Sequence, residues 1–152
     1  MAIVNLTVDN SFVLKPAVVE QVVDQTLKLA KHDLDFEIDV VTVGPKRMQE
    51  LNNRYRQVNK PTDVLSFGWQ QDKKLQAGFL GEIFLCLPII RQQAKDNNVE
   101  LKEELIRLIA HGTLHLVGFD HCTVKQEKEM FALQEKVVDY ETRKLPARHA
   151  TL

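Results

Sequence analysis

The sequence has few cysteines, no long apolar run and no basic segment at its N-terminus. Its two cysteines, Cys86 and Cys122, are too few to form a disulfide framework in a chain of 152 residues. The longest strongly apolar run covers residues 83–90, far short of the roughly 20 residues that a helix needs to span a bilayer. The first residues do not resemble a signal peptide, because Asp9 interrupts them before an apolar run can form. These absences predict a cytoplasmic protein with reduced thiols and no membrane partner.

The chain also lacks a strong net charge, which at pH 7 is −1. The sequence therefore has no global basic field to attract nucleic acid, although a local basic patch can suffice for binding. Hydrophobic residues make up 44% of the chain and charged residues 27%, as in average globular proteins, which excludes a disordered chain and a coiled coil. A length of 152 residues suits one core, and we expect a single domain over residues 1–152.

The spacing of apolar residues predicts a mixed α+β domain, in which a sheet of about four strands is packed with five or so helices. Alternating or β-branched segments predict the strands, at residues 3–9, 36–43, 61–67 and 79–86. Apolar residues at helical spacing predict the helices, at residues 16–31, from 45 onward, at 88–97, at 101–117, and from a capping box at 123–126 to about 146. A polar loop rich in Gln and Lys separates the last two strands. The order of the strands in the sheet does not follow from these patterns.

Three of the five histidines, His111, His115 and His121, fall within eleven residues of one another. On a helix of 3.6 residues per turn, His111 and His115 share one face about one turn apart, so both imidazoles can reach one ion. Gly118 allows the chain to leave the helix and bring His121 back to the same point. Because residues 105–119 contain a single charged residue, we expect a buried helix, on which imidazoles need hydrogen-bond partners or a metal. The pattern predicts a metal site on this helix and the following turn.

Three neutral imidazoles leave one position open on a tetrahedral ion, which is typical of catalytic rather than structural zinc. A water molecule at that position has its pKa lowered toward about 7 and becomes a nucleophile at neutral pH. A structural zinc would need a fourth ligand, for which Cys122 is the candidate, although it is adjacent to His121 and adjacent side chains tend to point apart. Asp120 could orient an imidazole or serve only as a turn residue.

The same spacing of histidines and glycine is found in the metzincin proteases. Those enzymes have a glutamate directly after the first histidine as their general base, and here Gly112 occupies that position. A general base typically contributes about 10²–10⁴-fold to the rate. A zinc-dependent peptidase or other amidohydrolase is therefore an alternative that needs a base from elsewhere in the fold.

A second informative segment, residues 46–60, carries five cations against a single anion, Glu50. The cations are Lys46, Arg47, Arg54, Arg56 and Lys60. They could form a solvated helix face, or a patch that faces phosphate, to which an arginine offers a bidentate fork. Peptide substrates do not require such a patch, so the segment favours a phosphodiester substrate.

The histidine motif resembles a known family when it is joined to two further segments. These are residues 52–67, which end in Pro-Thr-Asp-Val-Leu-Ser-Phe, and residues 81–83, Gly-Glu-Ile. Together, in order and spacing, they resemble the YbeY family of bacterial endoribonucleases, over roughly residues 40–140. The sequence departs from the family pattern at Gly68, where a proline is common, and at Glu82, where an aspartate is common.

The resemblance implies a zinc-dependent endoribonuclease that hydrolyses phosphodiester bonds of single-stranded RNA. One zinc ion would be bound by His111, His115 and His121, and Arg56 would be a catalytic residue. The resemblance also implies a role in ribosomal RNA maturation and ribosome quality control at the small ribosomal subunit, with no DNA substrate. An alternative of a different class is a non-catalytic ribosome assembly factor with a structural zinc and a basic helix that docks on RNA.

Other polar residues have weaker assignments. Asp63 and Ser66 could line the same cleft, although their positions are better explained as those of strand residues. His32 and His149 have no partners nearby in the sequence, and we expect both at the surface. The sequence identifies no general base.

Overall fold

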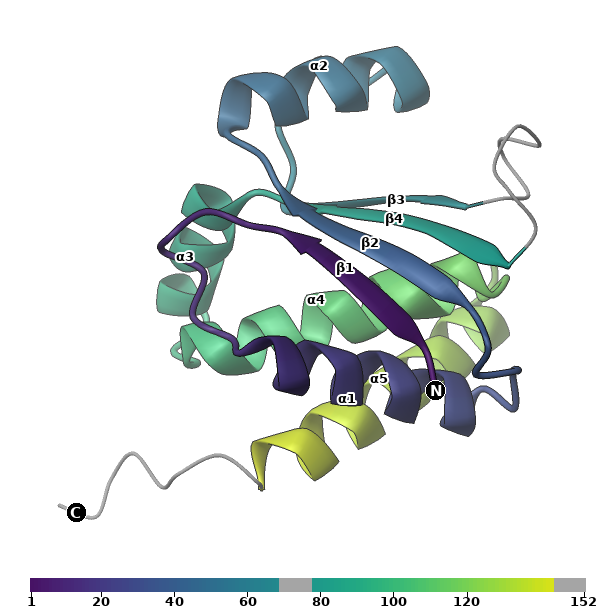
Figure 1. Cartoon of the computed structure of the whole chain (residues 1–152). Helices are drawn as coiled ribbons and strands as arrows, with labels where there is room; N and C mark the ends of the chain where they lie inside the picture. The colour runs from purple at the N-terminus through teal and green to yellow at the C-terminus, as the bar shows by residue number, and fades with distance from the viewer. Residues whose placement is uncertain (69–77, 144–152) are drawn as a thin grey trace, which may run out of the picture.

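A computed structural model describes residues 1–68 and 78–143 of the chain. The helices and strands follow in the order β1 (Ile3–Thr7), α1 (Pro16–Leu29), β2 (Glu37–Thr42), α2 (Pro45–Arg56), β3 (Val64–Gly68), β4 (Phe79–Leu85), α3 (Leu87–Asp96), α4 (Leu101–Leu116) and α5 (Val124–Thr142). The strands form one four-stranded sheet in the order β1-β2-β4-β3, with helices on both of its faces (Figure 1). The α+β fold that the sequence predicts is confirmed.

The sheet is mixed because its edge strand β3 runs opposite to the other strands. β1 pairs with β2, and β2 with β4, in parallel, and α1 and α2 lie in the connections that such pairs require. β3 pairs with β4 in antiparallel fashion, which places Ser66 opposite Ile83. β3 and α4 are in contact.

Two hydrophobic clusters pack on opposite faces of the sheet. The larger cluster lies between the sheet and α1, α4 and α5, and its fully buried members include Val22, Leu27, Ile38, Ile83, Leu105 and Ile109. α2 lies on the other face (Figure 1), where Met48 and Leu51 pack against Leu65 and Cys86. Burial of one such aliphatic side chain stabilises the fold by about 1.5–3 kcal/mol, so the larger cluster contributes most of the driving force.

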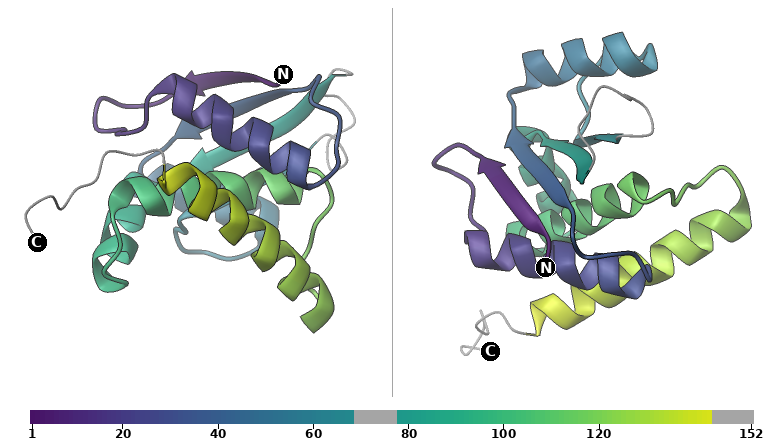
Figure 2. Two further views of the ribbon diagram at one scale, coloured as in Figure 1. Left: turned by 90° about the horizontal axis from the view of Figure 1, so that it is seen from below. Right: turned by 45° about the vertical axis from the view of Figure 1, so that its right-hand side comes forward.

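The central helix of the larger layer is α4. Figure 2 shows it between the sheet and α5, and it contacts both β3 and α5. Ten of its sixteen residues are buried, which explains why this segment contains so few charges. The prediction of a buried helix is confirmed. Its end also matches the prediction, because Gly118 has a φ of 99°, a conformation that glycine adopts without strain.

The predicted elements are present, with small differences at their ends. β1 stops at Thr7 rather than at residue 9, because the Asp9 N–H donates to Thr42 Oγ1 (2.9 Å) and the Asp9 carboxylate accepts from the Ser11 N–H (2.8 Å). These bonds form a turn in place of strand pairing. The predicted end of the last helix near residue 146, and most of the loop rich in Gln and Lys, lie outside the described residues. Within residues 1–68 and 78–143, every helix is too short or too polar to cross a membrane.

Candidate metal centre

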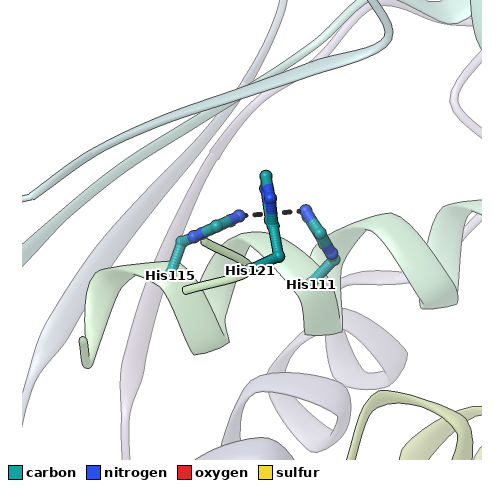
Figure 3. A group of neighbouring side chains, drawn as sticks. All are labelled: His111, His115 and His121. Carbon is teal, nitrogen blue, oxygen red and sulfur yellow. Dashed lines mark hydrogen bonds between the residues drawn. The ribbon is translucent and has the colours of Figure 1, made fainter. Parts of the chain in front are cut away.

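The last two turns of α4 and the loop that follows bring three imidazoles together (Figure 3). His111 and His115 project from one face of α4, and their Nε2 atoms are 3.1 Å apart. His121 approaches from the loop after Gly118, so that each of the three residues offers one nitrogen within 4.8 Å of the other two. The sequence predicts this grouping, and the structure shows that the three side chains could hold a metal ion.

The hydrogen bonds of the two helical imidazoles determine which ring nitrogens carry protons. His115 Nδ1 lies 3.0 Å from the carbonyl oxygen of Phe119, which can only accept, so this nitrogen must donate. His111 Nδ1 lies 2.9 Å from Oε1 of Gln134. The Gln134 amide is oriented by its other end, where Nε2 donates to the carboxylate of Glu135 (3.0 Å). In both imidazoles, therefore, Nδ1 carries the hydrogen and Nε2 presents a lone pair when the ring is neutral.

Two lone pairs that face each other at 3.1 Å repel unless a cation lies between or beside them. A proton shared by the two nitrogens would require one imidazole to be charged. Burial opposes that charge and lowers the pKa of His111, and burial together with the neighbouring imidazoles lowers the pKa of His115 to about 4. With Zn–N bonds of 2.0–2.1 Å, tetrahedral ligand atoms are about 3.3 Å apart, close to the 3.1 Å between Nε2 of His111 and Nε2 of His115. His121 offers a nitrogen within 4.8 Å of the ligand atoms of both. The donor set and its protonation therefore fit a metal ion.

A chain of polar contacts orients the His111 imidazole through its Nδ1 atom. Gln134 is buried on the side of α5 that packs on α4, and its neighbour Glu135 accepts two hydrogen bonds from Arg107, at 3.0 and 3.1 Å. Arg107 in turn pairs with Glu103 (3.1 Å) and Glu104 (3.3 Å) of its own helix. These residues connect α4 and α5 directly behind the imidazole and determine its orientation.

Gln134 is a functional residue that the histidine motif does not predict. One signal for it is present in the sequence, because Gln134 follows Met130 by four residues on the buried stripe of α5, where a polar side chain needs a partner. Its partner, His111, is 23 residues away in the sequence, on another helix.

Asp120 forms the hydrogen bonds of a turn residue, and none of the hydrogen bonds among the described residues joins it to an imidazole ring. Its Oδ1 accepts from the backbone N–H of His121 (2.7 Å), and its Oδ2 accepts from the thiol of Cys122 (3.0 Å). The hydrogen bond to Asp120 raises the pKa of the Cys122 thiol, which disfavours the thiolate that would bind zinc. Among the described residues, the group of converging ligand atoms contains the three histidines and not Cys122.

A cleft of about 620 Å³ opens beside the triad. Its walls are Tyr55 and Arg56 from the end of α2, residues 62–67 of the β3 segment, and the three histidines with the loop at 118–121. The volume lies within the range of about 300–1,000 Å³ that is usual for ligand sites. Arg56 is exposed and forms no ion pair with the described residues, so its guanidinium is available to a ligand.

Of the five cations in residues 46–60, only Arg56 lines this cleft in the described part of the chain. Arg47 pairs with Glu50 (3.4 Å), and the Arg54 guanidinium lies 5.5 Å from the centre of the Tyr55 ring. The segment is therefore mostly a solvated helix face, with one arginine directed to the cleft.

The remaining polar candidates have structural contacts. The Asp63 carboxylate accepts from the Val64 N–H (2.8 Å) and from the Gln93 amide (2.9 Å), which holds the start of β3, although Asp63 also lines the cleft. Ser66 lines the cleft too. The ring of His32 packs near Phe36, with 5.1 Å between centroids, and His32 is not part of the described lining of the cleft. His149 lies outside the described residues.

Gly112 is required by the packing of α4 against the sheet. A Cβ atom at this position would lie 2.9 Å from Ser66 Oγ and 3.1 Å from two carbons of Ile83. Because both neighbours belong to the adjacent strands β3 and β4, a side chain here would require Ser66 to rotate and Ile83 or the helix to shift. The close approach of α4 to the sheet therefore disfavours the glutamate that metzincins have at this position.

The fold and the site define a class of protein: an α+β layer structure in which a buried helix and its following loop present three imidazoles to a cleft. A family model described as "Endoribonuclease YbeY" matches residues 8–141, and the chain belongs to the YbeY family. An "Endoribonuclease YbeY" of Staphylococcus aureus (strain JH9) is 34% identical over 143 residues, which cover 86% of this chain and 91% of that protein. Another, of Brevibacillus brevis, is 40% identical over 120 residues, covering 70% and 76% of the two chains.

A solved structure supports the fold independently. The solution structure of TM1509 from Thermotoga maritima superposes with a TM-score of 0.62 and 26% sequence identity, and the alignment covers 100% of both chains. The chain is therefore similar over its whole length to an experimentally determined fold.

Proposed function

We propose that this protein is a zinc-dependent endoribonuclease that hydrolyses phosphodiester bonds of single-stranded RNA. Membership of the YbeY family supports an RNA substrate. The observation that carries the proposal is the pair of converging Nε2 lone pairs beside a cleft that also contains Arg56. The biological substrate we propose is ribosomal RNA, in maturation and quality control of the small ribosomal subunit, with no action on DNA.

The triad supplies three neutral nitrogen ligands and leaves a fourth position for water or substrate. When bound there, zinc would polarise a phosphate oxygen and lower the pKa of a water molecule. The depressed pKa values of His111 and His115 keep both imidazoles neutral at pH 7, so protons do not compete for the ligand atoms. Gln134 and the Phe119 carbonyl hold the two rings in the orientation that directs Nε2 toward the cleft.

Arg56 would stabilise the negative charge that accumulates on the phosphate in the transition state. It lines the same cleft as the triad, on the last turn of α2. Its planar guanidinium can contact two phosphate oxygens at once. A hydrogen-bond donor that points to the charge developing in the transition state increases the reaction rate more than a donor that binds the ground state. This role predicts that the side chain affects the rate more strongly than RNA binding.

One observation favours a second candidate, a zinc-dependent peptidase. β3 is the edge strand of the described sheet, and six consecutive residues, 62–67, line the cleft beside the triad. An exposed strand edge can bind an extended peptide by adding a strand to the sheet. Against this candidate, Gly112 provides no general base, and Arg56 has no evident role with a peptide.

The non-catalytic alternative, a ribosome assembly factor with a structural zinc, is weakened by the ligand set. A structural zinc normally has four protein ligands, and Cys122, the candidate fourth ligand, is bonded to Asp120 instead.

The test is cleavage of a defined single-stranded RNA by purified protein, with and without a chelator. Arg56→Ala should remain folded, lose at least about 10²-fold in cleavage rate and keep most of its RNA affinity. Arg47→Ala, which removes an arginine of the same helix outside the cleft, should cleave at the rate of the unaltered protein. Cleavage that survives both metal removal and His111→Ala would falsify the proposed catalytic role, and cleavage of peptides in place of RNA would support the peptidase.

A further inference from the structure

A second, smaller cavity of about 270 Å³ adjoins the triad on its α5 side. It is lined by His111, His121, Glu127, Met130, Phe131 and Gln134. His111 and His121 also line the main cleft. The triad therefore lies between two hollows, one walled by α2 and β3 and the other by α5.

Each hollow contains one aromatic side chain that is unusually exposed. The exposed fraction is 51% for Tyr55 in the main cleft and 60% for Phe131 in the second cavity. The Tyr55 ring is held in place by Phe67, with 4.6 Å between ring centroids. Phe131 lies on α5 next to the buried Met130, so the packing of the helix holds the backbone that carries its ring. Both sides of the triad thus offer a ring on a rigid element, with apolar surface that a ligand can cover.

The charges of the second cavity indicate what kind of group it accepts. Its described lining contains no lysine or arginine, and it includes the carboxylate of Glu127. This lining disfavours a phosphate. A nucleobase, by contrast, has an apolar face that can stack on Phe131 and polar edges that can donate to the carboxylate of Glu127.

We propose that a single RNA strand crosses the triad, with one base stacked on Tyr55 and a base on the other side of the cleaved phosphate stacked on Phe131. This inference rests on the RNA cleavage proposed above and extends it from the phosphate to the bases. Stacking on an aromatic ring tolerates any base but requires that the base be unpaired. Two rings, one on each side of the metal centre, would therefore select single strands without reading their sequence.

The test uses a short RNA of known cleavage position, with the fluorescent base 2-aminopurine next to the cleaved phosphate. When 2-aminopurine is placed on one side of the cleaved phosphate, stacking on Phe131 should quench its fluorescence. When it is placed on the other side, stacking on Tyr55 should quench it. Phe131→Ala should weaken RNA binding by about 5- to 150-fold, the loss expected for one stacked base, whereas Phe131→Trp should retain it. Tyr140→Ala, which removes another exposed aromatic of α5 that lines a different cavity, should bind RNA normally.

An RNA with an abasic site at the Phe131 position separates stacking from any structural effect. On this RNA the unaltered protein and Phe131→Ala should bind equally, because the stacking partner is missing from the ligand. The proposed strand path would be overturned if Phe131→Ala weakened binding of the intact and the abasic RNA equally, or if it left RNA binding unchanged. Either result would count against the path even if the protein cleaves RNA. Conversely, binding that depends on Phe131 without any cleavage would support the strand path and contradict the nuclease activity.

Discussion

The Nδ1 atom of His111 lies 2.9 Å from Oε1 of Gln134, and this contact joins α4 to α5 at the candidate metal centre. Because Gln134 also donates to Glu135, its amide oxygen has to face the imidazole. The geometry of the centre therefore depends on how two helices pack, and not only on the spacing of histidines within one of them.

Replacing Gln134 tests this dependence directly. Gln134→Leu keeps the size of the side chain but removes the acceptor, so the imidazole loses its fixed tautomer and orientation. We expect zinc affinity to fall by about 10–100-fold, the usual effect of losing such a partner. Gln134→Glu combined with Glu135→Gln retains an acceptor for His111 and a hydrogen bond between residues 134 and 135, and it should stay within a few-fold of the unaltered protein. Competition with a chelating indicator measures both values.

The matched control for this experiment is Gln92→Leu, which removes a glutamine that bonds Asp96 within the exposed face of α3. Its zinc affinity should not change. Equal affinities for Gln134→Leu and the unaltered protein would show that His111 is oriented by something other than Gln134.

Removing a ligand should affect metal content and stability together. We expect His115→Ala to bind less than stoichiometric zinc and to lose the rise in melting temperature that zinc gives the unaltered protein, because binding to the folded state alone stabilises it. Elemental analysis and thermal unfolding with and without zinc provide the two measurements. His32→Ala, a histidine outside the triad, should retain full zinc content. Full occupancy in His115→Ala would exclude the three-histidine site.

The metal-free protein should become less stable as the pH falls below neutrality. Burial and the neighbouring imidazoles lower the pKa of His115 to about 4 in the folded state, and an unfolded histidine titrates near 6.5. Between these values the unfolded chain binds more protons, so the free energy of unfolding rises with pH and then levels off above about 6.5. The lowered pKa of His111 contributes in the same direction.

Urea denaturation of the chelator-treated protein between pH 5 and 7 measures this slope, above the range in which carboxylates contribute most. His115→Gln removes one of the titrating groups and should flatten the curve. An unchanged slope in this variant would mean that the His115 imidazole is not desolvated in the folded protein.

The elements of the fold and the three histidines could be predicted from the sequence because each depends on local periodicity. Apolar spacing gave the helices and strands, and the i, i+4 relation with Gly118 gave the triad, which the structure brings within 4.8 Å. The order β1-β2-β4-β3 could not be predicted, because strand pairing joins residues that are far apart in the sequence. The contact between His111 and Gln134 escaped prediction for the same reason.

The basic segment shows a different limit. Residues 46–60 contain five cations, but a count of charges cannot predict which of them face a ligand. Helix α2 ends at Arg56, and the direction of its last turn relative to β3 decides that Arg56 lines the cleft, whereas Arg47 pairs with Glu50. This direction depends on how α2 packs in the folded protein, so the number of charges in the segment does not predict it.

The ionic contacts of Arg107 should stabilise both the fold and the metal centre. Arg107→Met leaves the carboxylates of Glu103, Glu104 and Glu135 without their shared partner, and Glu104 is buried. Since the group is partly exposed, we expect a loss of about 1–3 kcal/mol in the free energy of unfolding. Zinc affinity should fall as well, because Glu135 no longer holds Gln134. Loss of stability with unchanged zinc affinity would show that the ion pairs do not act on the imidazole.

Gly112→Ala tests the close packing of α4 on the sheet beneath the triad. A helix normally gains up to about 1 kcal/mol from this substitution. Here the new Cβ would lie 2.9 Å from Ser66 Oγ and 3.1 Å from Ile83, and such overpacking costs about 1–3 kcal/mol. We therefore expect a net loss of roughly 1 kcal/mol in urea denaturation, with weaker zinc binding because the helix that carries His111 and His115 must shift.

Two further variants make the result specific. Gly44→Ala places a methyl group where no atom lies within 4 Å, so it should cost only about 0.5 kcal/mol, because alanine is the poorer N-cap residue, and it should leave zinc binding unchanged. Ser66→Gly, combined with Gly112→Ala, removes the closest neighbour of the new methyl group and should restore part of the zinc affinity. If Gly112→Ala alone were more stable than the unaltered protein and bound zinc equally well, the helix would have room for a side chain. The absence of a glutamate after His111 would then need an explanation other than packing.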